Sequence, residues 1–273
     1  MGFVRPRCSR SCESKPQGVA KAPGASGLAR CPNALAPDKS LDTQSRGVDS
    51  AAMAGQEIIV GVSGASGARL AQRFVELILP TEELAVLHLV FSEAALEVAR
   101  GELDPEIATG EDWIARLHAS REAARKISLD SNDAVGAPIA SGSYPASGMI
   151  VLPCSAGTLG AIANGISRDL LQRAADVTLK ERRPLILAFR ESPYSLIHIE
   201  NMKRAAQAGA IVAPPSPAFY ISEPSVARFL DAYCVRAARM LHLTVAGEDY
   251  RWEGRRQTRA RRGPRRADAR RQK

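Results

Sequence analysis

The chain has 273 residues, of which 45% are hydrophobic, so it can bury the core of one α/β domain and still carry extensions. Its formal net charge is +8, but the excess lies at the ends. Residues 251–273 hold eleven Lys/Arg against two acids, and residues 1–52 hold eight against four, so the middle is slightly acidic. The basic end lacks interleaved aromatic residues, which argues against a specific nucleic-acid partner.

Cysteine usage and hydropathy indicate in which cellular compartment the protein is expected. Five cysteines are scattered along the chain, and this odd number argues against a disulfide framework and favours a reducing, cytoplasmic location. Cys8 and Cys12 lack a second pair of ligands, so we expect no metal site there. No apolar run reaches the roughly 18 residues that a membrane helix needs, so no membrane role is expected.

Composition divides the chain into three parts. Residues 1–52 are rich in Ser, Pro, Gly, Ala and Arg without a sustained period, which predicts a disordered N-terminal extension. Met53 stands just before the first expected strand, so translation from Met53 is one interpretation; a transit peptide is the rival, although the four acids count against it. The folded domain is expected over residues 53–250, and a basic, mostly disordered tail over residues 251–273.

The first structured segment combines a strand, a turn of small residues and a helix. β-Branched residues from Ile58 to Val62 predict a buried parallel strand. The chain then passes through Gly64, Ser66 and Gly67 into a helical pattern that Pro80 stops. Backbone N–H groups at such a turn and helix start can bind an oxyanion, although a turn without a ligand is the alternative. The spacing is neither the dinucleotide fingerprint nor a P-loop.

Further strands and helices alternate along the chain. Strands are predicted over residues 84–91, 148–153, 184–189 and 210–213. Helices are predicted over residues 93–100 and 112–127, from after Leu159 to about Asn164, and over residues 167–183, 195–209 and 223–243. Residues 130–147 form a long polar stretch, and loops of this length inside a domain are usually functional. The alternation predicts about five parallel strands covered on both faces, which is a flavodoxin-like or Rossmann-like three-layer α/β sandwich.

Two later segments carry polar groups to the ends of expected strands. Ser155 and Thr158 follow the third strand in a second turn of small residues and can offer hydroxyl and N–H groups to a ligand; a purely structural turn is the alternative. The pair Arg190–Glu191 ends the fourth strand, where a cation and a proton carrier would face a ligand crevice. Arg173 and Lys180 lie seven residues apart on one helix face, which is usually a solvated face.

Five segments together resemble the flavin prenyltransferase family, the UbiX/Pad type. They are Gly61–Gly67, Leu152–Leu159, Arg173–Pro184, Arg190–Glu191 and Pro217–Tyr220, and they occur in the family's order within a match from about Ile58 to Trp252. The resemblance implies that reduced FMN and dimethylallyl phosphate bind, and that the five-carbon unit is joined to flavin N5 and C6 without a metal. It also implies a large homo-oligomer such as a dodecamer with shared sites, and a UbiD-type decarboxylase that uses the product.

The same resemblance assigns roles residue by residue. Flavin contacts are implied for Gly64, Ala65, Ser66, Ser92, Ser155, Ala156, Gly157, Thr158 and Arg190. Contacts with the prenyl phosphate are implied for Arg173, Lys180, Tyr220 and Arg236, with Trp252 beside the allylic carbons. Catalytic roles are implied for Ser66, Glu102 and Glu191, of which Glu191 would handle protons at the leaving phosphate and in ring closure. The arginine-rich tail after Trp252 has no counterpart in the family pattern.

Three other functions remain as alternatives. An FMN-dependent cysteine decarboxylase of the same fold would need a catalytic histidine early in the domain, and His88 falls within a predicted strand. A flavin carrier without chemistry would not need Glu191 beside Arg190. Direct decarboxylation of an aromatic acid is the third alternative, but no segment indicates a carboxylic-acid decarboxylase site that is independent of the flavin.

Overall fold

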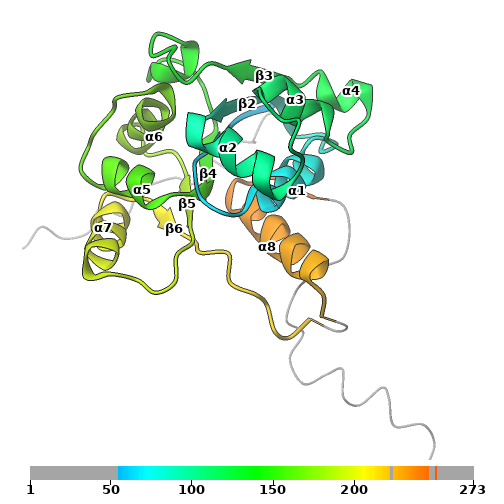
Figure 1. The fold of residues 1–273 in the computed structure, drawn as a ribbon. Coiled ribbons are helices and arrows are strands. Elements are labelled where there is room, and N and C mark those ends of the chain that lie inside the picture. Colours follow the sequence, from blue (N-terminus) through cyan, green and yellow to red (C-terminus); the bar gives the residue numbers. More distant parts are fainter. Residues whose placement is uncertain (1–54, 222–223, 246–249, 251–273) are drawn as a thin grey trace, which may run out of the picture. The chain divides into compact units, whose positions relative to one another are not determined.

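Six parallel strands form one sheet in the order β3-β2-β1-β4-β5-β6 (Figure 1). The computed structural model describes residues 55–221, 224–245 and 250. The strands are β1 (Gln56–Val62), β2 (Leu84–Phe91), β3 (Ile127–Asp130), β4 (Gly148–Cys154), β5 (Leu185–Phe189) and β6 (Ile211–Val212). The expected extension over residues 1–52, Met53, Trp252 and the tail over residues 251–273 lie outside the described residues.

Helices cover both faces of the sheet, so the predicted three-layer sandwich is confirmed. The helices are α1 (Ala68–Ile78), α2 (Glu93–Glu102), α3 (Gly110–Ala115), α4 (Arg121–Ala124), α5 (Ala156–Ala163), α6 (Leu170–Lys180), α7 (Leu196–Gln207) and α8 (Val226–Met240), with a 3₁₀ turn η1 (Pro138–Ala140). Alternate residues of a strand point to opposite faces. Thus Ile58 packs with α1 and α8, whereas Ile59 packs with α5 and α6.

The sheet has a topological switch point between β1 and β4. Strand order runs outward from β1 to β3 on one side and from β4 to β6 on the other, so the helices that follow β1 and β4 leave on opposite faces. In open parallel sheets, ligands bind in the crevice at the carboxyl ends of the strands at such a point. The turns after Val62 and Cys154 both lie at this edge of the sheet, at the switch point.

Buried Ser63 joins the two turns at the switch point. Its hydroxyl donates to the carbonyl of Pro153 at 2.8 Å and accepts from the N–H of Ser155 at 2.7 Å. Its side chain is almost fully buried. The N–H of Ser92 donates to the carbonyl of Val62 at 3.0 Å and links the end of β2 to the same place. Three strand ends are therefore held together by hydrogen bonds.

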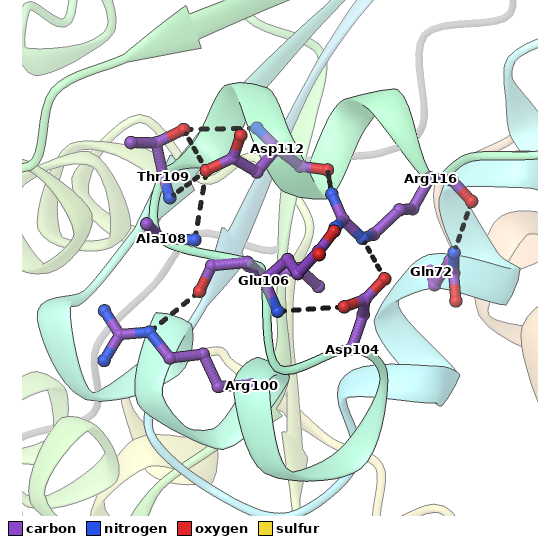
Figure 2. A network of polar contacts seen from close by, with 9 residues as sticks. Gln72, Arg100, Asp104, Glu106, Ala108, Thr109, Asp112 and Arg116 are labelled. Carbon is purple, nitrogen blue, oxygen red and sulfur yellow. Dashed lines mark hydrogen bonds and ion pairs between the residues drawn. The ribbon is translucent and has the colours of Figure 1, made fainter.

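The segment after α2 is fixed by a network of polar contacts around Arg116 (Figure 2). Its Nε donates to Asp104 at 2.7 Å, and its carbonyl accepts from Gln72 of α1 at 2.8 Å. Arg100 donates to the carbonyl of Ile107 at 2.8 Å. This network ties the last turn of α2 to the segment that follows it, and the end of α3 to α1.

The helix predicted over residues 112–127 is wrong. The structure has α3, a break, the single turn α4 and then β3, whose four residues pair with Leu87–Val90 of β2. Ser120 caps α4 by accepting from the N–H of Ala123, so a new helix starts where the periodic pattern suggested a continuous one. β3 is a short, half-buried edge strand, which is why only five strands were expected.

No helix of the described residues is both long enough and apolar enough to cross a membrane.

Packing at Gly64 gives a first prediction. A methyl group on Gly64 would overlap the Cβ of Ala94 in the first turn of α2, whereas one on Gly101 meets open space. Gly64→Ala should therefore destabilise the protein by about 1–3 kcal/mol through overpacking. Gly101→Ala, inside α2, should stabilise it by roughly 0.5–1 kcal/mol. Urea unfolding of both variants measures the difference, and equal midpoints would show that α2 does not pack tightly on this turn.

Candidate active site

The N-terminus of α1 is closed by the carboxylate of Glu102. The N–H of Gly67 donates to its two oxygens at 3.1 and 2.9 Å, and the N–H of Ala68 donates at 2.8 Å. Gly67 has φ of 133°, a conformation that favours glycine, and it supplies no side-chain cap of its own. The sequence indicated a site for the oxyanion of a ligand at this turn, but in the structure the N–H groups of Gly67 and Ala68 bind a carboxylate of the chain itself.

The charge of Glu102 is stabilised by its surroundings. Burial raises the pKa of this carboxyl group, but the hydrogen bonds from the Ser66 hydroxyl and the two backbone N–H groups, with the charge of Arg190, outweigh burial and lower the pKa. Arg190 also donates from Nε to the carbonyl of Ser66 at 3.2 Å. Three residues that the sequence named separately, Ser66, Glu102 and Arg190, thus lie in one cluster.

The second turn presents the N-terminus of α5, and Ser63 ties it to the first turn by accepting from the N–H of Ser155. Ser155 caps α5 by accepting from the N–H of Thr158 at 3.2 Å, and its hydroxyl donates to the Thr158 hydroxyl at 3.0 Å. Ala156 is half-buried and Gly157 is exposed, and a methyl group on Gly157 would meet no atom within 4 Å. The backbone of the first turn of α5 is therefore open to a ligand.

Ser92 borders a pocket of about 990 Å³ at the ends of β2 and β3. Its hydroxyl accepts from the N–H of Ala95 at 3.2 Å and caps α2. Five carboxylates line this pocket: Glu93, Glu111, Asp130, Asp133 and Asp169. Since these charges repel anions, a phosphate group would favour the open first turn of α5 at Ala156 and Gly157 over the interior of this pocket.

Tyr220 and Arg236 line one pocket of about 920 Å³ between β6, the proline-rich segment after it and α8. Arg236 is exposed, and the hydroxyl of Tyr220 donates to the carbonyl of Tyr250 at 3.2 Å. The buried Tyr233 hydroxyl donates to the carbonyl of Ala213 at 2.7 Å and fixes α8 to the end of β6. The pocket therefore offers a guanidinium group and a phenol, which suit an anionic ligand.

Lys180 lies apart from these residues. It ends α6, shortly before β5 begins, and forms an ion pair with Glu181. It lines a second pocket of about 640 Å³ with Arg182, Arg183 and His242, and this pocket shares Ile211 and Met240 with the pocket of Tyr220 and Arg236. The lining of the Tyr220–Arg236 pocket does not include Lys180, and the lining of the Lys180 pocket includes neither Tyr220 nor Arg236. Lys180 and the Tyr220–Arg236 pair therefore line different pockets of one chain.

Arg173 and Glu191 face other groups. Arg173 donates from Nη1 to Asp176 at 2.8 Å and from Nε to the carbonyl of Ala140 at 3.2 Å. Glu191 is exposed at the tip of β5, and its carboxylate accepts from the N–H of Ser192 at 3.1 Å. This carboxylate is accessible to a ligand in the crevice.

Sequence reasoning missed a buried polar cluster. His88 contacts Asp130 through Nδ1 and the Tyr144 hydroxyl through Nε2, both at 2.9 Å, and Tyr144 also donates to Glu57. The sequence feature that could have indicated this cluster is a histidine inside an apolar strand, because a buried polar side chain needs hydrogen-bond partners. Among residues 55–221, 224–245 and 250, no group of three or more His, Cys, Asp or Glu side chains is arranged to hold a metal ion.

Comparison with known proteins identifies the family. Residues 48–231 match the family model described as Flavoprotein. The chain is 40% identical over 204 residues to flavin prenyltransferase UbiX of Synechocystis sp., covering 73% of this chain and 97% of that protein. It is 36% identical over 200 residues to UbiX of Escherichia coli K12, covering 73% and 99%.

The chain belongs to the flavin prenyltransferase family.

Solved structures agree with this membership. The crystal structure of AnUbiX (PadA1) in complex with FMN and dimethylallyl pyrophosphate is similar, with a TM-score of 0.63, 37% identity, and coverage of 73% of this chain and 98% of that one. A dodecameric FMN-dependent UbiX-like decarboxylase from Escherichia coli O157:H7 has a TM-score of 0.62 and 33% identity, covering 73% and 100%. The flavin prenyltransferase relatives therefore span the domain described above.

Glu102 provides a pH-dependent prediction. Because its pKa is lowered in the folded protein, its contribution to stability should be present above the unfolded value near 4.5 and should vanish as pH falls through the folded pKa. Glu102→Gln should thus lower the urea midpoint at neutral pH, and the gap to wild type should close on acidification. Glu97→Gln, an exposed change on the same helix, is the control. A gap independent of pH would contradict a charge effect.

Proposed function

We propose that this protein transfers the dimethylallyl group of dimethylallyl phosphate to reduced FMN and releases prenylated FMN and inorganic phosphate. The observation that carries the proposal is the pair of turns at the switch point: one holds the cluster of Ser66, Glu102 and Arg190, the other is the open first turn of α5, and Ser63 joins them. Family membership and the similar structure that contains FMN and dimethylallyl pyrophosphate support the substrate classes. Cytoplasmic location remains part of the proposal.

The groups at the two turns of the switch point suit the polar parts of a flavin nucleotide. The turn at Gly64 and Ala65 and the turn at Ser155 to Thr158 present small residues and hydroxyl groups on two sides. Exposed Arg190 adds a positive charge beside them, and Ser92 lies at the neighbouring strand end. We infer that these residues hold FMN, with N–H groups and Arg190 available to its polar edge.

The chemistry requires a site that stabilises a leaving phosphate. When FMN is bound in reduced form, its N5 and C6 supply the nucleophilic atoms, and the allylic C–O bond of the prenyl phosphate breaks. Tyr220 and Arg236 would bind that phosphate, and each preorganised donor can supply roughly 2–4 kcal/mol in the transition state. Glu191 would carry the proton between the ring-closing carbon and the leaving phosphate, and Ser66 and Glu102 would position the flavin. Trp252 remains a proposed aromatic contact for the allylic group.

A second copy of the chain would complete the phosphate site. Lys180 lies outside the Tyr220–Arg236 pocket of its own chain, so we propose that Lys180, with Arg173 nearby on α6, reaches the pocket of another subunit. The dodecameric relative supports a homo-oligomer. The face of α7 supports one too, since Leu196 and Ile197 are 73% and 72% exposed. The released product would serve a UbiD-type decarboxylase.

The two flavin alternatives are less well supported. His88 is buried in β2 with Asp130 and Tyr144 as partners, so it is not available as the catalytic histidine of a cysteine decarboxylase. A flavin carrier gives no reason for an exposed carboxylate at Glu191 beside Arg190. Binding of FMN without any adduct in the assay below would favour these alternatives.

The direct test is anaerobic incubation with reduced FMN and dimethylallyl phosphate, followed by mass spectrometry of the flavin. We expect a flavin heavier by one C5 unit. Glu191→Gln should bind FMN as tightly as wild type but turn over at least about 100-fold more slowly, since it loses the proton carrier. Unchanged turnover would remove Glu191 from the mechanism, and bound FMN without adduct in the wild type would refute prenyl transfer.

Shared sites predict complementation between two inactive variants. Lys180→Ala and Arg236→Ala should each lose most activity when expressed alone. In a one-to-one mixed oligomer, about a quarter of the sites would combine an intact Lys180 and an intact Arg236 from different copies. Co-expression should therefore restore about that share of wild-type activity. No recovery in mixed oligomers, verified by differently tagged chains, would show that both residues act within one subunit.

A further inference from the structure

The segment between β3 and β4, residues 131–147, runs along α6 and is here called the strap. At its start, Asn132 accepts from the N–H groups of Leu170 and Leu171 at 2.7 and 3.0 Å, so it caps the first turn of α6. Midway, the carbonyl of Ala140 accepts from Arg173. Buried Ile139 packs in the same apolar cluster as the inner face of α6. The strap thus contacts the helix that carries Arg173 and Lys180.

The far end of the strap lies against the end of α6. Arg183 donates to the carbonyl of Tyr144 at 2.7 Å and to the carbonyl of Gly142 at 2.9 Å. A methyl group on Gly142 would overlap both the Lys180 ammonium group and the Glu181 carboxylate. The strap backbone therefore leaves just enough room for the Lys180–Glu181 ion pair.

A buried polar cluster fastens the strap to the sheet. The Tyr144 hydroxyl contacts Glu57 of β1 and, at 2.9 Å, Nε2 of His88 in β2. His88 in turn contacts Asp130 at the end of β3, and its ring meets the Tyr144 ring edge-on at 5.4 Å. His88 is 5% exposed. Residues of three strands thus converge on one phenol of the strap.

Placing these polar groups in the protein interior costs free energy, so the cluster calls for a structural reason. An imidazole is buried, and two carboxylates and a phenol are partly removed from water; burial and the Glu57 contact raise the pKa of Tyr144 to about 12. Apolar residues could fill the same space without that cost. A fully bonded polar cluster, however, admits only one arrangement of its members, so it fixes the strap in a single register on the sheet.

We propose that the Glu57–His88–Asp130–Tyr144 cluster is a latch that holds the strap and thereby sets the position of Lys180. Tyr144 and His88 are positioning residues: they act through Gly142 and Arg183 on the cation that binds the prenyl phosphate. This inference rests on the proposed function, since it assigns Lys180 to that phosphate.

Tyr144→Phe tests the latch because it keeps the ring and removes only the hydroxyl. The KM for dimethylallyl phosphate should rise about tenfold, because a displaced Lys180 weakens phosphate binding. The affinity for FMN should stay within about twofold of wild type, because only the start of the strap, at Ser131 to Asp133, lines the pocket beside Ser92, and Tyr144 lies at its other end. Gly142→Ala should raise the same KM without touching the cluster, because it displaces the ion pair directly.

Thr81→Val is the matched control. It removes one buried hydroxyl, which donates to the carbonyl of Ile78 at 2.8 Å, away from the strap. It should lower the melting temperature as Tyr144→Phe does but leave the KM unchanged. If Tyr144→Phe and Gly142→Ala change the KM no more than Thr81→Val, the latch has no role in phosphate binding and the proposal is overturned.

A second readout separates this inference from the proposed function. The rate at which acetic anhydride acetylates Lys180, relative to exposed Lys203 in the same molecule, is measured by peptide mass spectrometry. Both strap variants should change this ratio by at least about twofold, because the contacts around the ammonium group change. If the wild-type protein forms no prenylated flavin, the proposed function fails, but the acetylation ratio still tests the latch. An unchanged acetylation ratio in both variants would overturn the latch proposal.

Discussion

The bond between the Glu102 carboxylate and the first N–H groups of α1 determines how the rest of the crevice is arranged. A helix N-terminus attracts anions, and here a side chain of α2 occupies it. The phosphate of a nucleotide must then use the neighbouring turn at the start of α5 or the cations around it. Glu102 also fixes Ser66 and faces Arg190, so one carboxylate orders the groups from two strand ends.

The proposal that two subunits share the phosphate site follows from the direction of α6. In a parallel sheet, a crossover helix returns from the carboxyl edge to the amino edge before the next strand begins. Lys180 ends such a helix, so its ammonium group lies far along the chain path from the crevice beside Ser155. A cation at that edge can serve a ligand held by Tyr220 and Arg236 through contact with another copy. The exposed apolar side chains of α7 favour such contact.

The main strands and most helices could be predicted from the sequence because hydrophobic period and turn residues are local signals. The prediction failed between Asp112 and Ile127, where a capping serine and a short edge strand interrupt a pattern that also fits one helix. The cluster around His88 was beyond local reasoning, because its bonds join residues 42 to 87 positions apart.

The candidate site was predictable only in part. Glu102 was named through family resemblance, but its bonds to the first turn of α1 depend on how α2 packs. Ser63 gave no signal of its own, since a small hydroxyl residue in a turn is common, and only the structure reveals its bonds to both Pro153 and Ser155. The roles of individual residues toward ligands remain proposals.

The open face of α7 affects how the protein should behave on dilution. Leu196, Ile197 and Ile199 are 73%, 72% and 47% exposed in the single chain. Any self-association that covers them releases ordered water and stabilises only the folded state, so folding and assembly become thermodynamically linked. Thermal stability would then depend on protein concentration, and a dilute sample would melt earlier than a concentrated one with no change in any intrachain contact.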